Sequence, residues 1–237
     1  KIGLLIYPGV DYTGRLEVID IGMPKALIED EKINYELLNF EVIKGLLKPR
    51  QSNSHKGSFG HLFVLAGSVG KTGAAALTSL GAMRVGAGLV TLGIPASLNP
   101  IMEQKLTEVM TLPLSEPPFN SPLVKGGDRG VFPLNKGGYK GVGVFGYEAL
   151  KDIMEFVKDK KAVVMGPGIT TAKSVERLIL RLITKSPIPL VIDADALNCL
   201  ANDIKILKKA NVPIIITPHP GEMARLVGLT PQEVQEN

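Results

Sequence analysis

Residues 55–95, HKGSFGHLFVLAGSVGKTGAAALTSLGAMRVGAGLVTLGIP, decide the fold of this chain. An apolar run at 62–66 is followed by a glycine turn at 67–73, an alanine-rich stretch at 74–87 and a second apolar run at 89–94. That order predicts a strand, a tight loop, a helix and a second strand, which together form one βαβ unit. Because the helix consists almost entirely of small residues, its backbone can approach a sheet or a ligand closely.

The glycine turn, GSVGKT at 67–72, is similar to a phosphate-binding P-loop. The P-loop motif has four residues between its first glycine and its Gly-Lys pair, whereas this sequence has two. Besides a true P-loop, which this spacing disfavours, there are two alternatives: a turn that only joins strand to helix, and a helix N-terminus whose free N–H groups face an anionic ligand. The geometry of a helix N-terminus favours the second alternative.

The composition limits the classes of protein to which this chain can belong. Its 237 residues, 45% of them hydrophobic, suffice for one large α/β domain or a medium domain with an appendage. The single cysteine, Cys199, excludes an internal disulfide framework and is expected to be a buried small residue in a reducing compartment. We find no signal peptide or membrane-length apolar run, and we therefore expect a cytoplasmic protein without a membrane partner.

The pI near 9.0 does not indicate a nucleic-acid partner. Between residues 125 and 140, four lysines and arginines stand against one aspartate, so this segment alone carries +3 of the net charge of +4. A nucleic-acid-binding domain would distribute its positive charge over a face and interleave it with aromatic residues. No nucleic-acid partner is predicted.

The segments on either side of the central unit are less regular. Apolar runs at 3–7 and 16–22 predict two strands, and residues 25–54 form a charged connector with a short helix predicted at 40–47. Residues 117–146 are rich in glycine and contain the repeat KGGDRG and KGGYKG, which opposes both helix and strand. We interpret this stretch as a surface insertion, with a functional lid as the alternative.

Order returns after Tyr147, where a helix is predicted up to about residue 160. Three apolar runs then end abruptly in glycine or polar residues, at 162–168, 189–195 and 213–222. Continuous apolar runs predict strands that are buried on both faces, and therefore a parallel sheet covered by helices. The apolar spacing at 174–186 predicts an amphipathic crossover helix between the first two of these strands.

Polar residues gather where these three strands end. In parallel sheets, ligands bind at the carboxyl ends of the strands, so these positions predict a ligand site. Each residue also has a purely structural explanation: Asp193 or Asp195 can cap the following helix, and His219 can hold a turn between two prolines. The residues in question are Gly166, Gly168, Asp193, Asp195, Asn198, His219 and Glu222.

Five motifs in order resemble the ADP-dependent NAD(P)H-hydrate dehydratase family. They are HKGSFG, GKTGAAALTSLGAMRVGAGLVTLGIP, MGPGI, VIDADALN and TPHPGEMARL, and they cover most of residues 55–229. The resemblance implies an α/β, ribokinase-like fold with a largely parallel sheet and helices on both faces. Near the start, LIYPGVDYTGRLEVIDIGMP resembles the tail of the NAD(P)H-hydrate epimerase domain of bifunctional members. The resemblance therefore divides the chain into an epimerase tail (1–24), a connector (25–54) and a dehydratase domain (55–237).

The family implies a lyase that repairs hydrated NADH or NADPH by dehydration while ADP is converted to AMP. ADP is the implied co-substrate, Mg²⁺ the implied metal, and a cytoplasmic homo-oligomer the implied state. Glu222 is expected to hold the magnesium through water. The positions implied for binding the hydrated nucleotide are Ala74, Gly168, Asp193, Asn198 and His219.

The sequence departs from the family pattern in two places. Thr170 stands where many relatives have a glycine after GPG and a hydrophobic residue. No GSGD-type loop follows His219, so the expected catalytic aspartate lies beyond Asn237 and the dehydratase domain is expected to be truncated at its C-terminal end. Thr230 and Glu233 predict a capping box at the start of a last helix. The alternatives are a ribokinase-like small-molecule kinase and a non-catalytic nucleotide-binding fragment.

Overall fold

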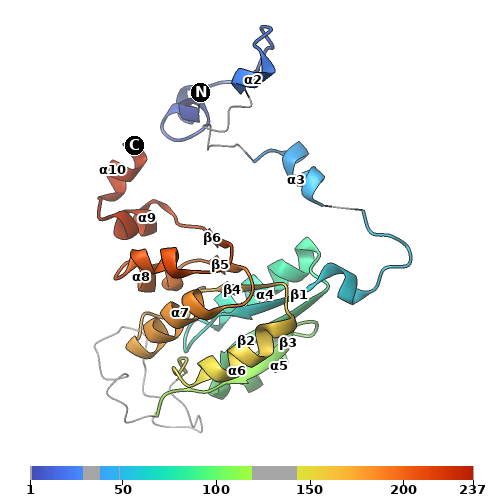
Figure 1. Ribbon diagram of the computed structural model, residues 1–237, viewed down its shortest axis with the longest axis vertical. Helices are drawn as coiled ribbons and strands as arrows, with labels where there is room; N and C mark the ends of the chain where they lie inside the picture. The colour runs from blue at the N-terminus through green and yellow to red at the C-terminus, as the bar shows by residue number, and fades with distance from the viewer. Residues whose placement is uncertain (1, 29–37, 48, 119–142, 237) are drawn as a thin grey trace. The chain divides into compact units, whose positions relative to one another are not determined.

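The computed structural model describes residues 2–28, 38–47, 49–118 and 143–236 (Figure 1). The chain forms two compact units, Lys1–Ser54 and His55–Asn237. The second unit contains the sheet and the candidate site. Within the described ranges, no helix is both long enough and apolar enough to cross a membrane.

The second unit is built on a six-stranded sheet in which every neighbouring pair is parallel, in the order β3-β2-β1-β4-β5-β6. From β1 the chain moves outward to β3 and then returns to the other side of β1 to form β4. The direction in which successive strands are added to the sheet therefore reverses between β1 and β4, where Leu65 is in register with Met165. The predicted parallel sheet is confirmed. Its strands are β1 His61–Leu65, β2 Leu89–Pro95, β3 Met110–Leu114, β4 Ala162–Met165, β5 Leu190–Ile192 and β6 Ile214–Ile216.

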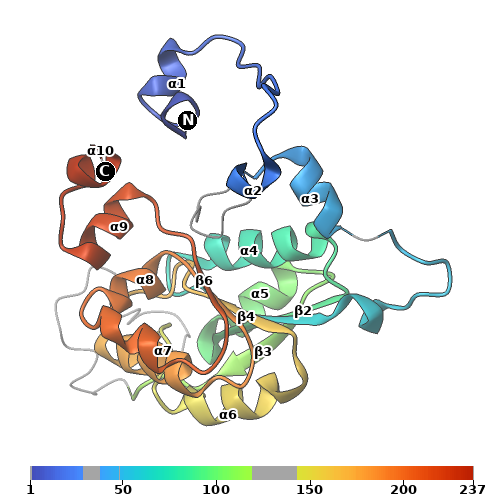
Figure 2. The ribbon, with the colours of Figure 1, turned by 45° about the horizontal axis from the view of Figure 1, so that its top comes forward.

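Helices cover both faces of the sheet, and the side chains of β1 alternate between two cores. Phe63 and Leu65 belong to the larger core, whereas Val64 and Ala66 belong to the smaller one. Figure 2 shows α4 on one side of the sheet and α6 on the other. The smaller core packs against α4 Thr72–Val85 and α5 Asn99–Lys105, and the larger against α6 Ala149–Phe156, α7 Lys173–Lys185 and α8 Asp195–Leu200. The remaining elements of this unit are the short helices η2 Lys56–Phe59, η3 Ala96–Leu98, η4 Val157–Asp159, η5 Ile204–Lys209, α9 Pro220–Val227 and α10 Pro231–Glu236.

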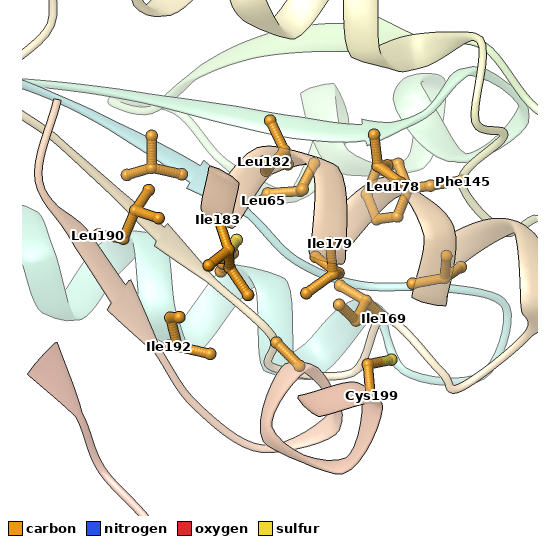
Figure 3. Packing of buried hydrophobic residues seen from close by; sticks show 14 of the residues in the cluster. Leu65, Phe145, Ile169, Leu178, Ile179, Leu182, Ile183, Leu190, Ile192 and Cys199 are labelled. Carbon is orange, nitrogen blue, oxygen red and sulfur yellow. The ribbon is translucent and has the colours of Figure 1, made fainter. Parts of the chain in front are cut away.

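The crossover helix α7 confirms the amphipathic pattern of its sequence. All five apolar residues of the predicted face are buried: Val175, Leu178, Ile179, Leu182 and Ile183. Figure 3 shows side chains of this face among those of β1 and β5. The buried face therefore fixes α7 on the sheet and leaves its polar face outward.

The small residues of α4 allow it to lie close to the sheet, as the sequence predicts. Ala75, Ala76 and Ser79 are buried between the helix and strands β1 and β2. The helix ends at Gly86, whose φ of 116° is in the left-handed region and whose N–H bonds to the last turn. On the outer side, Leu77 is exposed.

The first unit corrects two predictions. Residues 3–7 and 16–22 do not form strands; the chain forms η1 Ile2–Leu4 and α1 Gly9–Tyr12, then a segment without helix or strand up to α2 Lys25–Ile28. An isolated strand leaves its N–H and C=O groups unpaired, and the apolar side chains Val18 and Ile21 are exposed here. The helix predicted at 40–47 is confirmed as α3 Phe40–Leu46, capped by Asn39.

Most of the predicted glycine-rich insertion, residues 119–142, lies outside the described residues. Its flanks are tied together by Glu116, whose carboxylate accepts hydrogen bonds from the N–H groups of Ser97 at 2.6 Å and Gly143 at 2.7 Å. Val144 and Phe145 are fully buried in the larger core. The residues at the end of the predicted range therefore belong to the folded unit.

The edge strand β6 corrects the expectation that all strands are buried on both faces. Ile215 is 61% exposed, although β6 has the same apolar composition as its neighbours. A strand at the edge of a sheet has a neighbour on one side only, and the described helices do not cover this position. An apolar run alone does not distinguish a central strand from an edge strand.

In the part of the chain that the structure describes, two residues other than glycine have positive φ angles, and both follow a strand at its carboxyl end. They are Thr170, with φ of 72°, and Ala194, with φ of 50°. A β-branched residue such as threonine is disfavoured in this region by about 1–2 kcal/mol. Many members of the family have a glycine at the position of Thr170. The positive φ angle explains this, because glycine adopts such an angle without strain. Its N–H donates to Asp195 Oδ2 at 3.0 Å.

Replacing Ile179 tests the packing of α7. Ile179→Ala removes a fully buried side chain, and we expect it to lower the free energy of unfolding by about 2–5 kcal/mol in urea denaturation. Leu77→Ala is the control, because Leu77 is 75% exposed and its truncation should change the same quantity by less than about 0.5 kcal/mol. Equal losses in the two variants would contradict the described packing.

Two adjacent threonines test the strain at the end of β4. In Thr170→Gly the relief of strain offsets the extra chain entropy of glycine, so we expect this variant to be at least as stable as the parent protein. Thr171→Gly introduces the same glycine where φ is not positive and should lose about 0.4–1 kcal/mol. The measurement is the midpoint of thermal unfolding. A Thr170→Gly variant less stable than Thr171→Gly would show that the relief of strain is smaller than the loss of the buried Thr170 side chain and its hydrogen bond from the N–H of Ala172.

Candidate functional site

The candidate site begins where the carboxyl ends of β1 and β4 lie side by side. In sheets of this type, the crevice at the change of direction is the usual place for a ligand. The loops after the two strands are joined by a hydrogen bond from Gly67 N–H to the carbonyl of Pro167 at 2.9 Å and by one from Ser68 Oγ to the carbonyl of Gly168 at 2.6 Å. Ser68 is fully buried. The two loops therefore form one surface.

Two of the predicted binding residues meet on this surface. A Cβ atom placed on Gly168 would lie 3.2 Å from Cβ of Ala74 and 2.9 Å from Cβ of Lys71. Gly168 also has a φ of 71°, so a side chain there would be strained as well as crowded. The structure thus brings Ala74 and Gly168 together as a surface of small residues, which a flat ligand can approach closely.

The glycine turn does not have the open backbone of a P-loop. The N–H groups of Gly67, Val69 and Lys71 already donate to the carbonyl oxygens of Pro167, Gly143 and Ser68. The first turn of α4 can bind an anion through its backbone N–H groups, because the N-cap residue, Lys71, provides no side-chain cap for them. This arrangement supports the interpretation as a helix N-terminus rather than a phosphate-wrapping loop.

Asp195 connects three parts of the site. Its Oδ2 atom lies 2.9 Å from Lys71 Nζ and accepts the N–H of Thr170, and its Oδ1 atom lies 3.5 Å from Asn198 Nδ2. It does not cap the helix: it is the first residue of α8, and the N-cap residue Ala194 makes no side-chain cap. The carboxylate instead holds Lys71 beside the N-terminus of α4.

The side chains of Asp193 and Asn198 form hydrogen bonds with the segments that follow β5. Asp193 Oδ1 accepts a hydrogen bond from Thr217 Oγ1 at 2.8 Å, which ties the end of β5 to the end of β6. Asn198 Oδ1 accepts a hydrogen bond from Arg225 of α9. Neither residue caps a helix. Both side chains therefore have defined positions at the edge where the predicted site lies.

His219 holds a turn, as the structural alternative proposes. Its Nδ1 atom accepts a hydrogen bond from the N–H of Gly221 at 3.1 Å. The N–H of His219 in turn donates to Glu222 Oε2 at 3.0 Å, which completes a capping box at α9. The imidazole ring is 61% exposed, so this structural role leaves it accessible to a ligand. His55 caps η2 by the same contact to Gly57.

Glu222 does not fit the role of a direct metal ligand. Its carboxylate is buried, with one oxygen bonded to the His219 N–H and the other 3.3 Å from the His219 ring. Within the part of the chain that the structure describes, no three His, Cys, Asp or Glu side chains gather to hold a metal. The predicted contact through water stays a prediction.

Sequence reasoning missed two residues that position this site. Lys71 forms the ion pair with Asp195, which the sequence analysis names, and Arg225 orients Asn198. Lys71 stands inside a motif quoted above. Arg225 carries no comparable signal, because its contact with Asn198 depends on the packing of α9 against α8.

Comparison with known proteins places the chain in a family. A sequence model described as NAD(P)H-hydrate dehydratase matches residues 62–237. The bifunctional NAD(P)H-hydrate repair enzyme Nnr of Moorella thermoacetica is 36% identical over 237 residues, which is all of this chain and 40% of that protein. The protein of the same name from Escherichia coli is 30% identical over 238 residues, covering 100% of this chain and 38% of that protein. This chain thus spans about 40% of the length of these relatives.

Solved structures support the same assignment. An ADP/ATP-dependent NAD(P)H-hydrate dehydratase from Bacillus subtilis, co-crystallised with ATP and Mg²⁺, has a TM-score of 0.59 and 26% identity over 86% of this chain and 60% of that one. A ribokinase-like superfamily protein from Enterococcus faecalis has a TM-score of 0.58 and 17% identity over 84% of this chain and 61% of that one. The latter likeness shows the fold alone, and the predicted ribokinase-like fold is confirmed. The chain belongs to the NAD(P)H-hydrate dehydratase family.

Proposed function

We propose that the carboxyl edge of the sheet binds hydrated NADH or NADPH together with ADP, for a dehydration in which ADP is converted to AMP. One observation carries the proposal: the loops after β1 and β4 join at the change of direction of the sheet, through Ser68 and Gly168. This junction faces the N-terminus of α4 and carries the small surface of Ala74. Family membership supplies the substrate class, and the site geometry supports it.

The proposed roles follow from the contacts of each residue. Ala74 and Gly168 allow the nucleotide to lie against the backbone, and the first turn of α4 receives a phosphate group. Lys71 adds positive charge beside that turn and is held there by Asp195. Asp193, Asn198 and His219 line the remaining edge with polar groups whose positions are already fixed. No described residue is assigned the acid–base step.

A magnesium ion fits this proposal only through the nucleotide. Mg²⁺ in such sites commonly keeps several waters and is bound by phosphates and one or two carboxylates. Because both oxygens of Glu222 face His219, we propose that Glu222 acts on the ion through water. The expected homo-oligomer stays a prediction.

Two capping histidines allow a matched test of His219. His219→Ala and His55→Ala each remove a helix cap of the same geometry, so both should lower the free energy of unfolding, by about 0.5–2 kcal/mol. Only His219 lies at the carboxyl edge of the sheet. We therefore expect His219→Ala alone to weaken the binding of hydrated NADH, by about three- to tenfold, in calorimetric titrations.

His219→Asn separates the two roles of this residue. Asparagine is a good N-cap, so this variant should keep most of the stability while it removes the imidazole ring. Reduced affinity at retained stability supports a contact between the ring and the ligand. Equal affinities in His219→Ala and His55→Ala would exclude His219 from the site and leave it only the capping role.

A further inference from the structure

A groove runs along the outer face of α7, away from the carboxyl edge of the sheet. Its volume of about 590 Å³ lies within the range of small-molecule sites. We name it the basic groove. It is lined by Tyr147, Arg177, Leu180, Arg181, Thr184, Lys185, Ile206, Lys209 and Asn211.

The charged residues of the basic groove are all cations. Arg177, Arg181 and Lys185 are spaced four residues apart on α7 and therefore share one face of the helix, and Lys209 contributes from η5. None of the described residues that line the groove is a carboxylate. Like charges at this spacing destabilise a helix unless something of opposite charge compensates them.

Glu176, the acidic residue of α7, does not compensate the positive charges of the groove. Glu176 pairs with Lys173 at 2.8 Å and accepts a hydrogen bond from Asn202 at 3.2 Å. Among the residues that the structure describes, the four cations of the groove form no ion pair within 4.0 Å. The groove thus has a concentrated positive charge that no described residue pairs with.

The side chains at the groove are partly arranged in advance. The guanidinium of Arg177 lies 4.8 Å from the centre of the Tyr147 ring, and this contact restricts its orientation. Leu180 and Ile206 provide an apolar floor, and Thr184 and Asn211 add hydrogen-bonding groups. Arginine binds phosphate oxygens in pairs, because its N–H groups form a planar fork.

We propose that the basic groove binds a small ligand with two or more phosphate groups, at a site separate from the proposed active site. The three cations of α7 extend over about 12 Å of helix, so one linear polyphosphate can reach several of them. Lys185 and Lys209 precede the amino ends of β5 and β6, whereas the residues of the proposed active site follow the carboxyl ends. The proposal does not depend on the reaction of the family.

Calorimetric titration with tripolyphosphate tests the proposal directly. Arg177→Gln/Arg181→Gln removes two cations of the groove, and we expect it to weaken binding at low ionic strength by about tenfold or more. The matched control is Lys205→Gln/Lys208→Gln, which removes the same charge from η5 at positions that do not line the groove. We expect less than about a twofold change in the control.

A second arm of the experiment uses ATP. If the natural ligand is a nucleotide, the parent protein should bind one more equivalent of ATP than the Arg177→Gln/Arg181→Gln variant does, and that equivalent should bind more tightly than tripolyphosphate. If the groove recognises phosphates alone, the lost equivalent should have the same affinity for both ligands. ATP bound at the carboxyl edge contributes equally to the parent protein and the variant, so it does not affect the difference between them. Either result therefore supports phosphate binding in the groove.

Three results would overturn the proposal. The first is unchanged tripolyphosphate binding in Arg177→Gln/Arg181→Gln, with a thermal midpoint equal to that of the parent protein. The second is an equal loss in the lysine control, which would indicate a general effect of net charge. The third is a change of oligomeric state in the arginine variant without any binding of phosphate, which would make the groove a contact between copies of the chain. If the arginine variant unfolds, Lys185→Gln/Lys209→Gln replaces it, with the same expected result.

Discussion

The change of direction between β1 and β4 is the constraint on which the rest of the structure depends. The chain after β1 continues into α4 on one face of the sheet and the chain after β4 continues into α7 on the other, so the loops after these two paired strands begin side by side and then separate. The two glycines of the GPG sequence allow close approach on two sides: Gly168 lies against the loop after β1, where an added Cβ would come 3.2 Å from the carbonyl oxygen of Lys71, and Gly166 lies against the loop after β5. A Cβ atom on Gly166 would lie 1.7 Å from the carbonyl oxygen of Asp193. The site is thus formed by the topology before any side chain contributes.

The polar groups of the site already have partners within the protein. Asp195 holds Lys71, Thr217 donates to Asp193, Arg225 donates to Asn198, and Glu222 holds the turn of His219. A ligand that must break such contacts binds more weakly. A ligand that leaves them intact binds groups that are already ordered, so it does not pay the entropy of ordering them. The structural and binding explanations of these residues are therefore compatible, because the contacts that stabilise the turns also fix the polar atoms that face the edge.

The sequence predicts those features that depend on local patterns. The buried face of α7 and the strands of the sheet follow from apolar spacing over a few residues, and the small surface of Ala74 and Gly168 follows from the motifs. Edge position and strand pairing are not local, which is why residues 16–22 were predicted as a strand and Ile215 as buried. The Lys71–Asp195 ion pair joins residues 124 positions apart, so only the folded chain reveals it. Thr170 lies between these two cases. The sequence shows that a threonine replaces the usual glycine, but only the structure shows the positive φ angle that favours glycine at this position.

The exposed edge at β6 affects how the protein behaves at high concentration. Its outer N–H and C=O groups are a template for another strand, and the exposed Ile215 adds apolar contact area beside them. A net charge of +4 provides only modest repulsion between copies, and salt screens it. In the described sheet, the backbone of β6 is therefore a place where copies of this chain can pair in concentrated, salty solution, where the repulsion between their charges is screened.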